Sequence, residues 1–306
     1  MDRPPMKAIV TMPPYAPYMK EVLEHPLVSG IRLNTVMPIK DSQDEIVRKM
    51  DSAASALGKE FWVDLKCRQL RVASMSTPPY TAIQLSHKIE VFTPCTAYFG
   101  SRGCAATVLE VDDDKLIMQD GPKRVLGPGE SVTIPHPTLR VQGILTDTDR
   151  KYCDAVNKLP VPRVMASFVE NHADVAEVRK YSPKARIIAK IESPKGRDFV
   201  KHDYAKSSDG YGLMAARGDL YMEFHWPQEI IPTLETILAK DPQAVVASRI
   251  FDSFAEQPEP TCADIGDVDG LMRMGYRNYM FGDEVCMRRE SVMSALNLLA
   301  DMARGR

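Results

Sequence analysis

The stretches Ile187-Ile188-Ala189-Lys190-Ile191-Glu192 and Met214-Ala215-Ala216-Arg217-Gly218-Asp219-Leu220 indicate best how this chain is built. In each, an apolar run typical of a β-strand ends abruptly in charged residues. Because positions i and i+2 of a strand share a face, we expect Lys190 and Glu192 to point the same way. A lysine and two carboxylates at the ends of buried strands are costly unless they bind something. A divalent metal ion with an anionic substrate is their natural partner.

The same order of strand and helix recurs along most of the chain. The expected strands are 7–12, 30–37, 61–66, 163–168, 186–193, 211–217, 244–250 and 278–282. The expected helices are 17–25, 41–57, 148–159, 173–180, 194–203, 227–240, 261–274 and 290–304. Strands that alternate with helices predict a parallel sheet, and eight such units predict an α/β fold of the (β/α)8 TIM barrel type.

One segment interrupts this alternation. From Val72 to about Gln142 no convincing helix is present, and short alternating runs are divided by clusters of Gly, Pro and Asp. This pattern predicts a small all-β domain inserted after strand 3. We expect residues 1–71 and 143–306 to form the catalytic barrel, and residues 72–142 to form an inserted β-barrel lid domain. An insertion there leaves the C-terminal face of the barrel, where such barrels place their active sites.

Composition excludes several classes of protein. The six cysteines form no Cys-x-x-Cys pair and the six histidines are dispersed, which argues against a disulfide framework or a zinc site. A net charge of −2 gives no general attraction to nucleic acid or to anionic membranes. No apolar run approaches the roughly 18 residues that a membrane span needs, and the first residues contain no signal-peptide core. We therefore expect a cytoplasmic protein with no nucleic-acid or membrane partner.

Charged and polar residues gather at the carboxyl ends of the expected strands: Arg32, Asn34, Asp64, Lys66, Arg71, Lys190, Glu192, Arg217, Asp219, Ser248, Arg249, Asp283 and Glu284. Cations outnumber carboxylates on strands two to five, so the mouth should attract a small polyanion. A metal ion held by Glu192 and Asp219 could bridge a carboxylate and a phosphate, with Lys190 adding charge at a transferring group. Individually these residues also admit structural interpretations, and Arg32 could simply form an ion pair with Asp64.

The chain resembles the pyruvate kinase family, and the motifs that carry the resemblance follow one another along nearly the whole barrel. They are Gly30-Ile31-Arg32-Leu33-Asn34, Val63-Asp64-Leu65-Lys66 with Arg71, Met165-Ala166-Ser167-Phe168-Val169, residues 173–180, Lys190-Ile191-Glu192, Ser208-Asp209-Gly210, Arg217-Gly218-Asp219-Leu220, Ala247-Ser248 and Pro258-Glu259-Pro260-Thr261. The expected insertion also falls where that family has its lid domain.

The resemblance implies a role for each site residue. Glu192 and Asp219 would hold Mg²⁺ or Mn²⁺, and Lys190 would stabilise the transferring phosphoryl group and the enolate. Arg32 and Arg71 would contact phosphates, and the Gly218–Asp219 backbone with Ser248 would receive the substrate carboxylate. The implied catalytic residues are Lys190, Arg32 and Ser248, and the implied substrate-binding residues are Arg32, Asn34, Asp64, Lys66, Arg71, Gly218, Asp219 and Ser248.

The chain also departs from the family pattern. Asn34 and Asp64 keep two of the four usual ligands of a monovalent cation, but Val36 and Leu65 replace the hydroxyl residues, which makes a potassium requirement doubtful. The paired aspartates and the nucleotide-contacting lysine of the lid have no clear counterpart. Since the sequence stops at Arg306, we expect the regulatory C-terminal domain of the family to be absent.

Three functions remain open from the sequence. The first is phosphoryl transfer between phosphoenolpyruvate and ADP, giving pyruvate and ATP, as in glycolysis. The second is a nucleotide-independent, metal-dependent lyase, a decarboxylase or aldolase, that acts on ketoacids of the pyruvate or oxaloacetate type. The third is a non-catalytic sensor of the same ligands, against which the intact catalytic set argues. The resemblance also implies a homo-oligomer that associates through the later helices.

Overall fold

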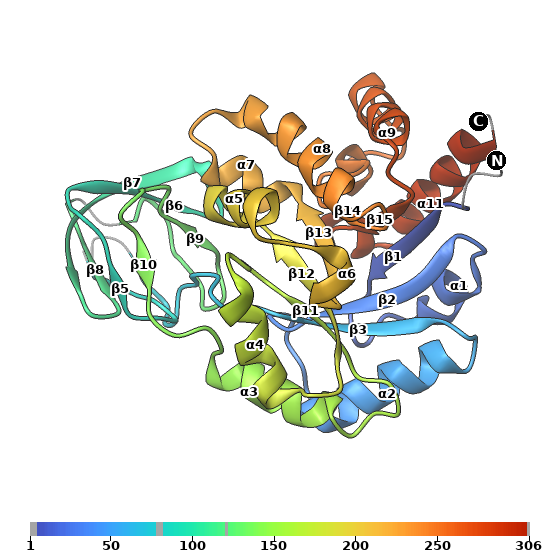
Figure 1. Ribbon diagram of the computed structural model, residues 1–306, viewed down its shortest axis with the longest axis horizontal. Coiled ribbons are helices and arrows are strands. Elements are labelled where there is room, and N and C mark those ends of the chain that lie inside the picture. The colour runs from blue at the N-terminus through green and yellow to red at the C-terminus, as the bar shows by residue number, and fades with distance from the viewer. Residues whose placement is uncertain (1–4, 78–81, 120–121, 305–306) are drawn as a thin grey trace.

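The structure, a computed structural model, describes residues 5–77, 82–119 and 122–304. Residues 1–4 and 305–306, at the ends of the expected barrel segments, and residues 78–81 and 120–121, within the expected insertion, lie outside the described residues. The centre is a closed barrel of parallel strands in the order β1-β15-β14-β13-β12-β11-β3-β2 (Figure 1). Its strands are β1 (Lys7–Thr11), β2 (Val28–Asn34), β3 (Glu60–Leu65), β11 (Arg163–Ala166), β12 (Arg186–Ile191), β13 (Gly212–Ala216), β14 (Val245–Ala247) and β15 (Asn278–Phe281). The expected (β/α)8 barrel is confirmed.

Helices follow the barrel strands and cover their outer side. They are α1 (Met19–Glu24), α2 (Gln43–Ser55), α3 (Asp147–Val156), α4 (His172–Tyr181), α5 (Pro194–His202), α6 (Lys206–Asp209), α7 (Arg217–Glu223), α8 (Ile230–Lys240), α9 (Cys262–Met274), α10 (Asp283–Cys286) and α11 (Arg289–Arg304). Ser42, Thr146 and Thr261 begin α2, α3 and α9 with capping boxes, which explains why these helices start where they do. None of the described helices is long and apolar enough to cross a membrane.

Alternation along the strands decides which side chains reach the interior of the barrel. On β12, Ile187, Ala189 and Ile191 belong to the large core between strands and helices, whereas Ile188 belongs to a separate apolar cluster. That cluster takes residues from seven of the barrel strands: Ile9, Trp62, Met165, Ile188, Met214, Val245, Ala247 and Met280. Since Lys190 follows Ile188 by two positions, it shares the inward face of β12. The charged side chains therefore stand above an apolar layer that fills the barrel.

β2 and β3 approach each other closely at Gly30. A Cβ atom on Gly30 would lie 2.7 Å from the backbone oxygen of Glu60, so the register of the two strands requires glycine at this position. This close approach places the ends of β2 and β3 side by side.

The residues between β3 and α3 form an all-β insertion with its own sheet, which lies beside the barrel (Figure 1). The sheet has the order β4-β8-β7-β6-β9, and β10 pairs with β5. Its strands are β4 (Ala82–Gln84), β5 (Ile89–Glu90), β6 (Cys95–Phe99), β7 (Ser101–Asp112), β8 (Lys115–Met118), β9 (Val132–Thr133) and β10 (Arg140–Val141). A second hydrophobic core, centred on residues such as Phe99 and Leu116, fills the insertion. The exact domain limits expected from the sequence stay a prediction.

One arginine of the insertion holds a barrel helix. Arg102 on β7 donates from Nη2 to the carbonyl oxygens of Tyr221 at 2.8 Å and Phe224 at 2.7 Å. Its guanidinium also lies 5.1 Å from the centre of the Tyr221 ring. These carbonyls stand at the C-terminal end of α7, where no helical partner remains for them. The insertion thus supplies hydrogen-bond donors to the last carbonyl groups of α7, the helix whose first turn carries Asp219.

Several expected strands extend too far, and functional residues expected at strand ends lie just beyond them. Arg217 and Asp219 begin α7 rather than ending a strand. Ser248 and Arg249 follow β14 with φ angles of 66° and 54°, which a strand cannot accommodate. Asp283 begins α10. In each case the chain turns sharply as it leaves the sheet, so that the functional side chains sit on turns and first helical turns just beyond the strands.

Candidate active site

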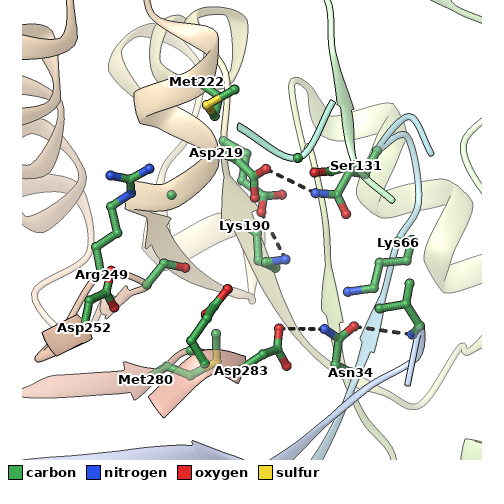
Figure 2. A pocket seen from close by; sticks show the side chains of 18 of the residues that line it. Asn34, Lys66, Ser131, Lys190, Asp219, Met222, Arg249, Asp252, Met280 and Asp283 are labelled. Carbon is green, nitrogen blue, oxygen red and sulfur yellow. Dashed lines mark hydrogen bonds and ion pairs between the residues drawn. The ribbon is translucent and has the colours of Figure 1, made fainter. Parts of the chain in front are cut away.

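A cavity of about 540 Å³ opens at the C-terminal ends of the barrel strands (Figure 2). Nearly all of the site residues expected from the sequence line it: Arg32, Asn34, Lys66, Arg71, Lys190, Glu192, Gly218, Asp219 and Ser248. Asp64 lies directly behind this lining, in contact with several of these side chains. The insertion contributes Gly100, Ser131 and Thr133. The cavity is therefore built from both parts of the chain.

Asp64 is the centre of a buried group of charges. Its carboxylate accepts hydrogen bonds from Arg32 Nε at 3.0 Å and from Lys66 Nζ at 2.8 Å, and Lys190 Nζ lies 3.3 Å away. Ser167 Oγ accepts a further hydrogen bond from Lys190 at 2.8 Å. The ion pair of Arg32 with Asp64 that the sequence left open as a structural reading is present. The carboxylate of Asp64 thus contacts three cations of the pocket, Arg32, Lys66 and Lys190.

The charges around Asp64 set its protonation and that of its neighbours. Burial alone would raise the pKa of Asp64, but Arg32, Lys190 and Lys66 hold it well below its usual range. Burial would lower the pKa of Lys190, but Asp64 and Glu192 raise it, so Lys190 carries its charge. Burial lowers the pKa of Lys66 to about 8, and the positive charges of Arg32 and Lys190 act in the same direction.

Glu192 and Asp219 form the carboxylate pair of the cavity. Glu192 is fully buried, and its Oε2 accepts a hydrogen bond from the backbone N–H of Phe168 at 2.7 Å. Its Oε1 lies 3.0 Å from Lys190 Nζ but accepts no hydrogen bond. Burial raises the pKa of Glu192 to about 8, opposed by Lys190 and reinforced by Asp219. Asp219 Oδ1 accepts a hydrogen bond from Gln69 Nε2 at 3.2 Å.

These two carboxylates fit a hard divalent cation. The buried Oε1 of Glu192 accepts no hydrogen bond and is paired with the Lys190 ammonium, so it keeps lone-pair capacity that a metal ion can use. Within the described part of the chain, no group of three or more His, Cys, Asp and Glu side chains is placed to hold a metal ion. Mg²⁺ is commonly bound by one or two carboxylates, with substrate and water completing its coordination. The donor set matches that mode of binding.

Comparison with known proteins agrees with this geometry. The family described as "Pyruvate kinase, barrel domain" matches residues 96–286, well over half of the chain. The chain belongs to the pyruvate kinase family.

Individual pyruvate kinases are distant relatives of this chain. The pyruvate kinase of Borreliella burgdorferi is 24% identical over 90% of this chain and 62% of its own length. Two pyruvate kinases of Agrobacterium vitis are 33% identical over 58% of this chain and 37% of their own, and 28% identical over 88% and 60%, respectively. The chain thus spans about 60% of the length of the Borreliella burgdorferi enzyme and of the second Agrobacterium vitis enzyme.

The turn that the pyruvate kinase resemblance assigns to the substrate carboxylate is braced by Arg217. Arg217 donates from Nε to the Ser248 carbonyl at 3.1 Å, and Nη2 donates to the Arg249 carbonyl. Asp267 holds the same guanidinium at 2.7 Å. A Cβ atom on Gly218 would lie 3.3 Å from Ser248 Cβ, so glycine allows the two segments to approach. Arg217 therefore supports the pocket from behind, a role that the sequence did not indicate.

Arg71, which the pyruvate kinase resemblance assigns to phosphate binding, is partly engaged within the protein. Its guanidinium donates to Gln69 Oε1, with Nε at 3.2 Å, and to the Gly129 carbonyl of the insertion. Burial lowers the pKa of Arg71. Because Gln69 in turn donates to Asp219, a chain of contacts connects the insertion, Arg71 and the carboxylate pair.

Four further carboxylates line the cavity: Asp252, Glu256, Asp283 and Glu284. Asp252 lies near Arg249, whereas Asp283 faces Asn34 (Figure 2). The excess of cations expected for strands two to five thus does not extend to the loops after β14 and β15. Asp252 and Glu256 lie beyond β14, in or next to a short 3₁₀ turn, and sequence reasoning missed both. The signal that could have found them is their position just after Ser248 in a loop at the C-terminal face.

Proposed function

We propose that this protein catalyses divalent-metal-dependent phosphoryl transfer between phosphoenolpyruvate and ADP, with Mg²⁺ or Mn²⁺ held by Glu192 and Asp219. The observation that carries the proposal is the position of Lys190. Its ammonium stands on the inward face of β12, charged, next to both Asp64 and Glu192. A buried ammonium beside a metal-ligating carboxylate can stabilise the negative charge of a transferring phosphoryl group and of an enolate.

The other side chains bind and orient the substrate. Arg32, fixed by Asp64, would contact the phosphoryl group with Lys190, and Arg71 would contact phosphate from the insertion side. The backbone amides at Gly218 and Asp219, in the first turn of α7, and the hydroxyl of Ser248 would receive the carboxylate. When bound, the metal ion would supply Lewis-acid stabilisation of developing oxygen charge.

A coupled assay with phosphoenolpyruvate, ADP and Mg²⁺ tests this function. We expect pyruvate formation from the wild-type protein and at least a hundredfold loss for Asp219→Asn. The unfolding midpoint of the variant should be nearly unchanged, because asparagine keeps the side-chain oxygen that accepts from Gln69. No pyruvate from a wild-type protein that still binds Mn²⁺ with oxalate would exclude the kinase reaction and keep the site. A fully active Asp219→Asn protein would exclude the metal assignment.

The same assay tests potassium. Both oxygens of Asp64 are already engaged by Arg32, Lys66 and Lys190. The Lys66 ammonium therefore occupies the carboxylate that a bound monovalent cation would need as a ligand. We expect the rate in Na⁺ to equal the rate in K⁺ within about twofold. A strict requirement for K⁺ would contradict this arrangement.

A nucleotide-independent lyase on ketoacids is the second candidate. It is favoured by the internal pairing of the phosphate-binding groups, since Arg71 is bonded to Gln69 and Gly129, and Asn34 to Asp283. Release of CO₂ from oxaloacetate in the presence of Mn²⁺, without nucleotide, would favour this reaction. The homo-oligomer and the cytoplasmic location expected from the sequence stay predictions.

A further inference from the structure

Asp283 is hydrogen-bonded to Arg32 and Asn34, two donors that a phosphate in the cavity would approach. Its Oδ2 accepts a hydrogen bond from Asn34 Nδ2 at 2.8 Å (Figure 2). Its Oδ1 accepts one from Arg32 Nη1 at 3.3 Å. Its side chain is 36% exposed and lines the cavity, so the carboxylate faces the solvent that a ligand displaces. An internal carboxylate thus holds the donors that would otherwise serve a ligand anion.

Arg32 does not need Asp283 to keep its position. Its Nε donates to Asp64, and its Nη1 donates to Thr11 Oγ1 at 2.9 Å. Thr11 is itself fixed, because its hydroxyl donates to the Phe281 carbonyl at 2.8 Å. Asp283 contacts the guanidinium on the side that faces the cavity. Removing the charge at position 283 therefore changes the electrostatics of the anion site while its geometry is kept by Asp64 and Thr11.

Asp283 reduces the positive charge that this part of the cavity offers to a ligand anion. Arg32, Lys66 and Lys190 face Asp64 and Glu192, and Asp283 adds a third carboxylate. A phosphoryl group brings about two negative charges to this position, whereas the ligand carboxylate is assigned to the Gly218–Ser248 side. The repulsion from Asp283 thus falls on the phosphoryl group far more than on a ligand carboxylate.

We propose that Asp283 is a specificity-determining residue that weakens binding of the phosphoryl group and thereby favours unphosphorylated ketoacids and their analogues over phosphorylated ones. This inference rests on the proposed function in one respect, the assignment of Arg32 to the phosphoryl group. A phosphorylated ligand enters by displacing the carboxylate of Asp283 from Arg32 and Asn34. An unphosphorylated ligand binds with that contact intact.

Calorimetric titration of the full protein in Mn²⁺ with phosphoenolpyruvate and, separately, with oxalate tests the inference. At an effective dielectric constant of about 20, removing one unit charge within about 5 Å of a dianion changes affinity by tenfold or more. We expect Asp283→Asn to bind phosphoenolpyruvate about tenfold or more tightly than wild type, and oxalate within about twofold. Equal effects on both ligands, or no effect on phosphoenolpyruvate, would overturn the proposal.

Glu284→Gln is the matched control. It removes the same charge from the adjacent position, an exposed residue of the same cavity whose charge acts on Asp252. We expect phosphoenolpyruvate affinity to change by less than about twofold, and a gain equal to that of Asp283→Asn would overturn a specific role for Asp283. If no variant turns phosphoenolpyruvate and ADP into pyruvate while the contrast in binding is present, the proposed kinase function fails and the inference about Asp283 stands.

Discussion

At the scale of single residues, the site is a set of charges that neutralise one another inside a barrel. Asp64 holds Arg32 and Lys66 and lies next to Lys190, and Glu192 stands on the other side of that ammonium. Breaking such a group by removing one member leaves an uncompensated buried charge, which is strongly destabilising. The chain therefore depends on these residues for folding as well as for binding.

Lys66 provides a test through pH. Its pKa in the folded protein is about 8, below the ordinary value near 10.4, because burial disfavours its charge. Between these values the unfolded chain binds the proton and the folded chain does not, so the contribution of Lys66 to stability rises with pH. We expect the free energy of unfolding of wild type minus that of Lys66→Met to increase between pH 8 and pH 10, by about 3 kcal/mol at most.

Urea unfolding of the two proteins at both pH values measures this difference. Taking the difference cancels the titration of other groups, such as Glu192, that both proteins share. A difference that falls as pH rises would mean that Lys66 carries its charge more readily in the folded protein than in the unfolded one.

At the scale of elements, the alternation of residues along β2, β3 and β12 places the functional side chains. The sequence predicts this well, since the inward positions of β12 hold Ile188 and Lys190 and the outward ones belong to the main core. It predicts the departures from the strands poorly. Ser248 and Arg249 adopt positive φ angles that nothing in their residue types favours, and the bonds from Arg217 that support this turn come from another element.

The close approach of β2 and β3 gives a test at this scale. Gly30→Ala would place a methyl group 2.7 Å from a backbone oxygen of Glu60, which cannot rotate away. We expect a loss of about 1–3 kcal/mol in the free energy of unfolding, measured in denaturant. Gly270→Ala is the control, because no atom lies within 4 Å of the added methyl and the residue is inside α9. There we expect a gain of about 0.5–1 kcal/mol. Equal effects at the two positions would contradict the packing described.

At the scale of the whole molecule, the chain contains two separate hydrophobic cores. One lies between the barrel strands and their helices, and the other fills the insertion with far fewer buried side chains. The sequence predicts both parts from the change in pattern after the third strand. It could not predict the contact of Arg32 with Asp283, because the two residues are 251 positions apart and meet only when the barrel closes.

The two cores predict different local stabilities. We expect native-state hydrogen exchange to open the amides of β6 and β7 at a lower free energy than those of β3 and β12, because fewer buried contacts must be broken. Mass spectrometry of exchanged peptides from the two regions makes the comparison. Identical opening free energies in both regions would mean that barrel and insertion unfold as one unit.

The hydrogen bonds from Arg102 to the end of α7 connect the insertion to the carboxylate pair. One end of that helix carries Asp219, and the insertion holds the other end through the carbonyls of Tyr221 and Phe224. If the insertion moves relative to α7, that movement and the affinity at the carboxylate pair are coupled, and the coupling is reciprocal. In that case a molecule bound only to the insertion would change ligand affinity at Asp219, and a ligand in the cavity would change affinity at the insertion by the same factor.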